Sequence, residues 1–262
     1  MSTTANSIQN KVICGNCIDV MQTLPDGCID LTVTSPPYDN LRDYNGYTFD
    51  FEGIANQLYR ITKDGGVVVW VVGDATVNGS ETGTSFRQAL YFKEIGFNLH
   101  DTMIYQKNNF ANPSNNRYHQ IFEYMFILSK GVPNIFKPIK DRKNVIVGKR
   151  NISPSRNADG SMSRPTTEKV VNEYGQRYNV WVVPTTNIIG HPAPFPEQIA
   201  NDHIITWSNE GDLVLDPMCG SGTTCKMAMV NNRNYIGIDI SEEYCNIARK
   251  RIAEHEQQLT LI

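Results

Sequence analysis

The sequence of 262 residues has no long hydrophobic run. Its longest apolar stretch, Val67 to Val72, is far shorter than the roughly 20 residues with which a helix crosses a bilayer. Residues 1–6 are polar and lack the basic and apolar regions of a signal peptide. These absences argue against a membrane protein and an exported protein, and we expect a cytoplasmic location.

Cysteine is also too scarce for a disulfide framework, since a chain of this length has only six. Cys14 and Cys17 have the spacing of a redox motif or of half a zinc site. No second pair of this kind and no histidine cluster with ligand spacing accompanies them. We therefore expect reduced thiols and no metal site.

Net charge is low as well. A formal charge of −3 and a pI near 6.0 argue against a protein that coats nucleic acid non-specifically. The charge is uneven, however, because residues 130–177 contain eleven Lys and Arg against four Asp and Glu. A basic segment on an acidic body indicates a polyanion that docks on one side only, the alternative being a solvated basic loop.

Short apolar segments alternate with segments of helical periodicity along most of the chain. We expect strands near 11–14, 29–33, 67–72, 97–105, 121–128, 178–183, 212–216 and 235–239, and helices near 17–24, 54–61, 85–95 and after 197. This order predicts an α/β fold: a doubly wound, mostly parallel, Rossmann-like sheet with helices on both faces. Trp70 and Trp181 should lie in its core. Between residues 131 and 189 the regular patterning fades, which predicts a small insertion.

The stretch Thr34 to Tyr38 follows one of these strands and forms a rigid ledge rich in hydrogen-bond acceptors. Pro36 and Pro37 fix the backbone and remove two N–H donors, so carbonyl oxygens are exposed without competing donors. Ser35 adds a hydroxyl and Tyr38 a flat ring. A flipped nucleobase with an exocyclic amine suits such a ledge, although a plain strand-ending turn fits it too.

A second informative stretch lies near the C-terminus. A strand ends at Asp216, a glycine-rich turn with Gly220 and Gly222 follows, and a second strand ends at Asp239. A strand, a glycine turn and a later carboxylate describe a nucleoside cofactor site. The turn lacks the third glycine of the dinucleotide fingerprint and any lysine for phosphates. S-adenosylmethionine fits better, because Asp216 would attract its ammonium group.

With both stretches in view, the chain resembles prokaryotic amino-DNA methyltransferases of the beta subgroup. Thr34 to Tyr38 matches the catalytic motif of that family, Asp216 to Thr224 its methyl-donor motif, and residues 237–240 the segment with its ribose-binding acid. The resemblance implies a circularly permuted motif order: a catalytic half at 1–130, a target-recognition insertion at 131–189, and a donor-binding half at 190–262.

The resemblance also implies roles for individual residues. Catalysis falls on Ser35, Pro36, Pro37 and Tyr38, and binding of S-adenosylmethionine on Asn16, Phe195, Pro196, Asp216, Pro217, Gly220, Gly222, Thr223, Asp239 and Ile240. Asn16 departs from the pattern, because the family often has aspartate there; its carbonyl can still accept a bond from the adenine amine. Candidate DNA contacts are Arg42, Arg117, Arg142, Lys143, Lys149, Arg150, Arg156 and Arg164.

In this family a serine in the first position of the catalytic motif is associated more often with N4 of cytosine than with N6 of adenine. We therefore expect transfer of a methyl group to the N4 of a flipped cytosine, with N6 of adenine as the alternative. A protein-amide methyltransferase and an inactive DNA-binding module also remain open, and a nucleotide-dependent oxidoreductase is disfavoured by the missing glycine. The expected partners are double-stranded DNA, which would place the protein at the nucleoid, and a restriction endonuclease that acts on the same site. The protein would be a monomer or a homodimer.

Overall fold

The computed structural model describes residues 7–37, 49–110, 113–148, 150–151, 154–163, 169–185 and 196–259. The chain divides into two compact units. Met1–Lys137 and Asn179–Ile262 form the first, and Pro138–Tyr178 forms the second. The second unit is shorter than the segment 131–189 that loses regular patterning, because residues 131–137 and 179–185 belong to the first unit.

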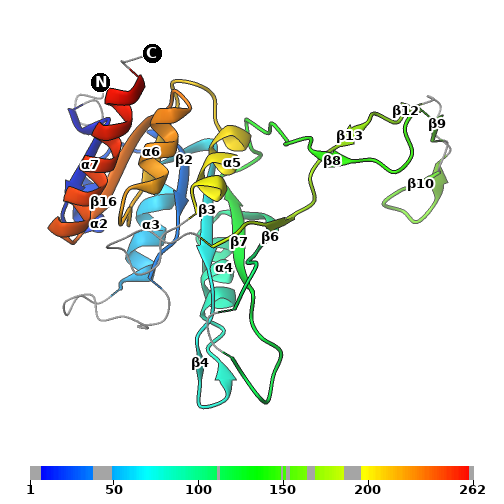
Figure 1. Cartoon of the computed structure of the whole chain (residues 1–262), viewed down its shortest axis with the longest axis horizontal. Helices are drawn as coiled ribbons and strands as arrows, with labels where there is room; N and C mark the ends of the chain where they lie inside the picture. The colour runs from blue at the N-terminus through cyan, green and yellow to red at the C-terminus, as the bar shows by residue number, and fades with distance from the viewer. Residues whose placement is uncertain are drawn as a thin grey trace. The chain divides into compact units, whose positions relative to one another are not determined.

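The first unit is built on one eight-stranded sheet with the order β1-β16-β15-β2-β3-β7-β6-β14 (Figure 1). Its strands are β1 (Lys11–Cys14), β2 (Ile29–Thr34), β3 (Thr62–Val72), β6 (Asn98–Gln106), β7 (Phe122–Ser129), β14 (Val180–Val182), β15 (Leu213–Asp216) and β16 (Asn234–Asp239). Five neighbouring pairs are parallel, and only β3 with β7 and β7 with β6 are antiparallel. The prediction of a mostly parallel sheet is confirmed.

The alternation of side chains along β3 explains why helices cover both faces of the sheet. Val67, Val69 and Val71 pack into one buried cluster with α5 (Glu197–Trp207), α6 (Thr223–Val230) and α7 (Glu242–Leu259). Val68, Trp70 and Val72 pack into the other with α2 (Cys17–Gln22), α3 (Phe51–Ile61) and α4 (Thr84–Glu94). Because successive strand residues point to opposite faces, an uninterrupted apolar strand requires two helical layers.

Both tryptophans that the sequence placed in the core are buried, Trp70 at 0% and Trp181 at 5% exposure. One boundary was predicted wrongly, because the strand near 67–72 was expected to begin only after Asp64 to Gly66. In the structure β3 already begins at Thr62 and includes these residues. The Gly65 N–H donates to the Lys130 carbonyl and the Lys130 N–H to the Gly66 carbonyl, which extends the pairing with the segment after β7.

Two smaller features complete the description. The hairpin of β4 (Thr76–Val77) and β5 (Ser80–Glu81) follows β3 in the first unit. In the described part of the chain, no helix combines the length and the apolar character that crossing a membrane requires.

The central position of Trp70 generates a stability prediction. Its ring packs edge-on against Phe51 and Phe92, and its Nε1 donates to Gln88 Oε1 over 2.9 Å. Trp70→Ala should lower the free energy of unfolding by about 3–5 kcal/mol, measured by urea denaturation. Tyr118→Ala is the control: that side chain is 99% exposed and its loss should change stability by less than about 0.5 kcal/mol. Equal effects of the two substitutions would refute this picture of the core.

Candidate functional site

The two motifs singled out in the sequence meet at one edge of the sheet. β2 and β15 are parallel neighbours, with Leu31 opposite Val214 and Thr32 opposite Leu215. Both strands therefore end at the same edge, where β2 leads into Ser35 and β15 ends at Asp216. In open α/β sheets, ligands bind outside the carboxyl ends of the strands.

Two hydrogen bonds join the motifs directly. The Thr34 hydroxyl donates to Asp216 Oδ1 over 2.8 Å, and the Thr224 hydroxyl donates to the Val33 carbonyl over 3.1 Å. Both contacts are buried. The end of the first motif's strand is thus fixed to the acid and to the helix start of the second, although 182 positions separate Thr34 from Asp216.

The ledge itself is described up to Pro37. Pro36 is buried, whereas Ser35 and Pro37 are half-buried at the end of β2. Three residues expected in the site or at the DNA, Tyr38, Arg42 and Phe195, lie outside the described residues. The described part of the ledge presents a serine hydroxyl and proline carbonyls beside the strand that carries Asp216.

Asp216 is a buried acid with 5% of its surface exposed. Burial raises its pKa to about 6, although hydrogen bonds from Thr34, Met218 and Thr224 favour the ionised form. The nearby charge of Asp239 raises the pKa further. Among the described residues, no Lys or Arg forms an ion pair with Asp216. A ligand cation at this carboxylate would therefore favour its ionised form.

The glycine-rich turn after β15 owes its shape to two left-handed residues, Gly220 with φ +48° and Gly222 with φ +77°. Gly222 is also pressed against α7: a Cβ at this position would lie 2.6 Å from the Ala248 Cβ. A hydrogen bond also fixes the start of the turn, because the Gly220 N–H donates to Asp239 Oδ2 over 2.8 Å. The Asp239 carboxylate thus joins the turn to the end of β16.

The remaining nucleoside residues lie at the next strand ends. β1 and β16 are parallel, with Cys14 opposite Asp239, and the Gly15 N–H donates to the Asp239 carbonyl. Asn16 is exposed and caps α2, its Oδ1 accepting from the Ile18 N–H over 2.8 Å and its carbonyl from the Val20 N–H. Ile240 follows directly on Asp239. The structure thus brings Asn16, Asp239 and Ile240 to one edge.

This donor set suits S-adenosylmethionine. A buried carboxylate without a protein cation suits an ammonium group, and a partly exposed carboxylate at the end of the second strand suits ribose hydroxyls. Pro217 and Thr223, on either side of the glycines, are buried, and Pro196 is buried just before α5. The chemistry of the site therefore agrees with the cofactor expected from the sequence.

Sequence reasoning missed the residues that hold the turn from behind. From α7, Arg251 donates through Nη1 to the Ser221 carbonyl over 2.6 Å and to the Ser221 hydroxyl over 2.8 Å, and through Nη2 to Glu197 Oε1. Lys226 on α6 also binds Glu197. Burial opposes ionisation of Glu197, but the bond and charge of Lys226, together with Arg251, hold its pKa below the usual value.

A signal for this support exists in the sequence, although it is weak. Arg251 lies three residues after Ala248 and directly before Ile252, both of which are buried on α7. A charged residue beside an apolar helical stripe indicates a partner inside the molecule rather than solvent. Thr34 had no such signal, because a threonine inside an apolar strand is common.

The candidate DNA contacts fall into different environments. Arg117 donates to the Thr76 hydroxyl and to the Gly79 carbonyl, so it braces the β4–β5 hairpin. Arg142 donates to the Gln176 carbonyl and lies over the Tyr178 ring. Lys143 and Arg156 are exposed. For the others, Lys149 and Arg164 lie outside the described residues, and only the backbone of Arg150 is described.

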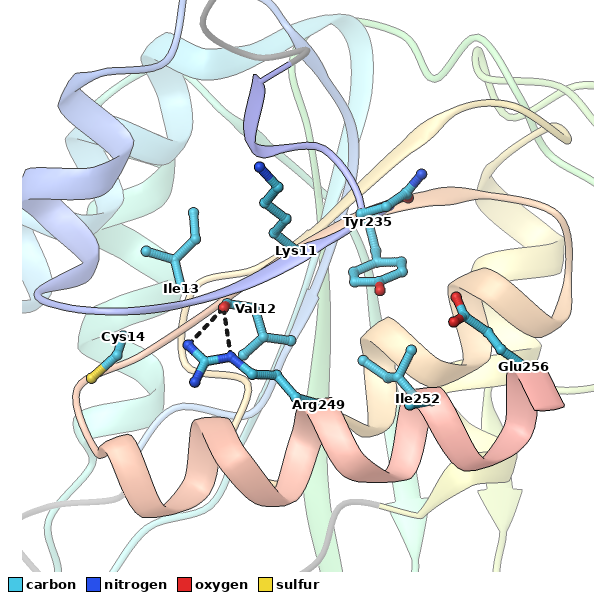
Figure 2. Close-up of a pocket in the computed structure, with 10 residues that line it drawn as sticks. Lys11, Val12, Ile13, Cys14, Tyr235, Arg249, Ile252 and Glu256 are labelled. Carbon is cyan, nitrogen blue, oxygen red and sulfur yellow. Dashed lines mark hydrogen bonds between the residues drawn. The ribbon is translucent and has the colours of Figure 1, made fainter.

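A shallow cavity of about 600 Å³ lies elsewhere, between the edge strand β1 and α7 (Figure 2). Arg249 reaches across it and donates from Nε and Nη2 to the Val12 carbonyl over 3.2 and 3.0 Å. None of the residues that line it belongs to the motifs above. Arg249 covers a sheet edge, which protects the edge from pairing with other chains.

The fold and the site define a methyltransferase of the Rossmann-like class, and the chain belongs to the DNA methylase family that groups N6 and N4 methylases, whose model matches residues 29–250. The orphan methyltransferase M.BamHII of Bacillus amyloliquefaciens is 57% identical over 244 residues, which cover 89% of this chain and 92% of that protein. The resemblance drawn from the two motifs is confirmed.

Solved structures share the fold. The PvuII DNA methyltransferase, described as cytosine-N4-specific, superposes with a TM-score of 0.67 at 19% identity and covers 92% of this chain and 85% of its own. A putative DNA modification methylase of Thermus thermophilus, solved with S-adenosyl-L-methionine, gives 0.65 at 22% identity, with 93% of each chain covered.

The close approach of Gly222 to α7 generates a second prediction. Gly222→Ala combines a left-handed backbone with a clash against Ala248, and should lower the free energy of unfolding by about 2–4 kcal/mol. Gly79→Ala is a matched control, because Gly79 has φ +81° but nothing within 4 Å of an added Cβ. It should cost only the backbone strain of about 1–2 kcal/mol. Thermal or urea unfolding measures both, and an equal loss in the two variants would contradict the packing of the turn.

The buried acid generates a third prediction, concerning pH. The pKa of Asp216 is about 6 in the fold and near 3.8 when unfolded, so the fold binds its proton more tightly. The contribution of Asp216 to stability should therefore fall by about 2.4 kcal/mol as pH rises from 4 to 7. Asp216→Asn removes this titration. The free energy of unfolding of the variant minus that of wild type should therefore increase by that amount as pH rises over the same range.

Urea denaturation at several pH values measures this gap. Ser80→Ala, which alters an exposed side chain without an ionisable group, should leave the difference between variant and wild type independent of pH. A constant gap for Asp216→Asn would show that the carboxylate is not desolvated.

Proposed function

We propose that the protein transfers a methyl group from S-adenosylmethionine to the exocyclic N4 of a flipped cytosine in double-stranded DNA. The observation that carries this proposal is the buried junction of Thr34 with Asp216, which ties the end of β2 to the donor turn. Methyl transfer needs the acceptor nitrogen and the donor methyl within about 3–3.5 Å of each other. Motifs at the ends of two adjacent parallel strands support this proposal, because they place the two binding sites side by side.

S-adenosylmethionine, when bound, supplies an electrophilic methyl group on a sulfonium. The protein's part is to hold and orient its ligands. Asp216 would bind the ammonium group, and Asp239 and the Asn16 carbonyl would bind the nucleoside. Gly222 lets this turn pack directly against α7, because a Cβ at that position would lie 2.6 Å from the Ala248 Cβ.

The ledge acts on the base. The amine lone pair of cytosine is delocalised into the ring and is a poor nucleophile. The Ser35 side chain and the Pro36 carbonyl accept its two hydrogens, which biases the nitrogen toward tetrahedral geometry and aims its lone pair at the methyl group. Orientation supplies up to about 7–11 kcal/mol, more than the roughly 3–5 kcal/mol of a general base. We therefore infer direct in-line transfer without a covalent enzyme–base intermediate: the nitrogen–methyl bond would form as the sulfonium–methyl bond breaks, S-adenosylhomocysteine would leave, and the amine would lose one proton to solvent.

Cytosine is favoured over adenine by Ser35, since serine begins this motif more often in enzymes that act on cytosine N4. The PvuII enzyme, which shares the fold, is named as specific for that atom. Adenine N6 presents the same kind of planar amine and is the second candidate, because the ledge contacts only the amine and the ring face.

The test is to incubate the protein with S-adenosylmethionine labelled in its methyl group and duplex DNA of mixed sequence, and then to digest the DNA to nucleosides for mass spectrometry. We expect label in N4-methylcytosine. Label in N6-methyladenine would overturn the base assignment and leave the reaction class intact. Unlabelled DNA together with a methylated polypeptide would overturn the DNA proposal.

Ser35→Ala tests the ledge in the same assay. Loss of an acceptor used in the transition state should lower kcat by about 10- to 100-fold and leave the affinity for S-adenosylmethionine unchanged. Ser80→Ala, in the exposed β5 strand, is the control and should retain full activity. An unchanged kcat in Ser35→Ala would remove Ser35 from the mechanism.

A further inference from the structure

Arg251 on α7 is a partly buried cation, with 16% of its side chain exposed. Its Nη1 lies within hydrogen-bond distance of three oxygens of the glycine-rich turn: the Ser221 carbonyl at 2.6 Å, the Ser221 hydroxyl at 2.8 Å and the Thr223 hydroxyl at 3.3 Å. Both turn residues are buried, with 3% and 4% of their surface exposed. Hydrogen bonds from a charged donor are about twice as strong as those between neutral groups. Arg251 therefore fixes this stretch of the turn through directed bonds.

A second contact fixes the orientation of the guanidinium itself. Its Nη2 donates to Glu197 Oε1 over 2.8 Å, and Glu197 is the first residue of α5. Lys226 on α6 binds the same carboxylate oxygen over 2.8 Å. Three helices that cover one face of the sheet, α5, α6 and α7, thus meet at this carboxylate (Figure 1). Because a guanidinium is planar, contacts at two of its nitrogens set its direction as well as its position.

The stretch that Arg251 holds leads directly to the buried acid of the site. Thr224 follows Thr223 in α6, and its hydroxyl donates to the Val33 carbonyl over 3.1 Å. Burial raises the pKa of the Asp216 carboxyl, and a hydrogen bond from the Thr224 side chain opposes this rise. A shift of the backbone at Thr223 would therefore move a hydrogen-bond donor of the Asp216 carboxylate.

The other carboxylate of the site has a separate support. The Gly220 N–H donates to Asp239 Oδ2 over 2.8 Å, and the Gly15 N–H donates to the Asp239 carbonyl over 2.9 Å. Neither bond involves the described residues that Arg251 binds. A change at Arg251 should therefore affect the Asp216 end of the site and spare the Asp239 end.

We propose that Arg251, held by Glu197, is a positioning residue for S-adenosylmethionine: through Ser221 and Thr223 it sets the turn so that Asp216 is ready for the ammonium end of the donor. A turn that is already held in its bound geometry loses less conformational freedom on binding, so the affinity is higher. The inference rests on the proposed role of Asp216. It concerns the affinity for the donor and not the base that is methylated.

Calorimetry with the whole chain and S-adenosylmethionine, without DNA, measures this role. Arg251→Met keeps an unbranched side chain and removes the donors, so the dissociation constant should rise by about 10- to 30-fold. Arg251→Lys cannot reproduce the planar fork and should raise it by a smaller factor, about 3- to 10-fold. Lys250→Met is the control, because this neighbouring side chain is 78% exposed and its loss should leave the constant unchanged.

A second ligand separates positioning from a general loss of structure. 5′-Methylthioadenosine carries the adenosine and the sulfur of the donor but neither its ammonium nor its carboxylate group. Its dissociation constant in Arg251→Met should stay within about 2-fold of wild type, because Asp239 keeps its own bonds. Equal weakening of both ligands would overturn the proposal and make Arg251 a residue of general stability.

A double-mutant cycle tests whether Glu197 acts through Arg251. Glu197→Gln removes the charge that orients the guanidinium and should weaken binding of S-adenosylmethionine by about 2- to 5-fold. Once Arg251 is replaced by methionine, the same change should have no further effect. Factors that multiply in the double variant would show that Glu197 supports the donor by another route, which contradicts the proposed relay.

The outcomes keep this inference apart from the proposed function. If wild type binds no S-adenosylmethionine, the donor assignment fails and this inference fails with it. If wild type binds the donor and methylates DNA while Arg251→Met keeps the wild-type affinity, only the role of Arg251 fails. If Arg251→Met does not fold, Arg251→Lys decides: weaker binding of S-adenosylmethionine alone supports the role, and unchanged binding overturns it.

Discussion

A hydrogen bond between the Thr34 hydroxyl and the Asp216 carboxylate joins the two halves of the site. It forms because β2 and β15 are neighbours in the sheet. In the sequence, four other strands of the sheet, the second unit and α5 lie among the segments between them. Buried charged acceptors need donors, and a bond to a charged group contributes about 1.5–3 kcal/mol. The same contact that satisfies the acid also fixes the strand that ends in the acceptor ledge.

Burying the Asp216 carboxylate lowers the stability of the fold and keeps a negative charge ready for a ligand cation. Holding Asp216 out of water is unfavourable, as its raised pKa shows. Two packing constraints help to keep it there: Gly222 against Ala248, and Arg251 with Glu197 behind the turn. A site that a ligand cation completes is expected to be less stable when empty, because pre-organised charge is favourable only with its partner.

The two helical layers and the edge that holds the two acids could be predicted from the sequence, because each depends on a short stretch of residues. The uninterrupted apolar strand at Val67 to Val72 required helices on both faces, and acids at the ends of Leu213–Asp216 and Asn234–Asp239 required a shared edge. What the sequence did not show depends on contacts far apart in the chain. The Thr34 hydroxyl has a role only because Asp216 is its neighbour, and Arg251 only because α7 packs behind the turn.

The strand pairs of the insertion also could not be predicted from the sequence. No hydrophobic period marks residues 138–178, because short strand pairs with both faces in water need none. Its pairing becomes visible only in the register, in which Arg142 lies opposite Gly175 and Arg156 opposite Met162. Composition predicted a basic insertion, whereas its strand pairs are visible only in the backbone ladder.

The central claim is that Thr34 and Asp216 work as one unit in donor binding, and a double-mutant cycle measures it directly. Calorimetry would give the affinity for S-adenosylmethionine of wild type, Thr34→Val, Asp216→Asn and the double variant. The account predicts that the two losses are not additive, with a coupling of about 1–3 kcal/mol, because either substitution removes the same buried contact. Additive losses within about 0.3 kcal/mol would contradict it and show that the two motifs bind the donor independently.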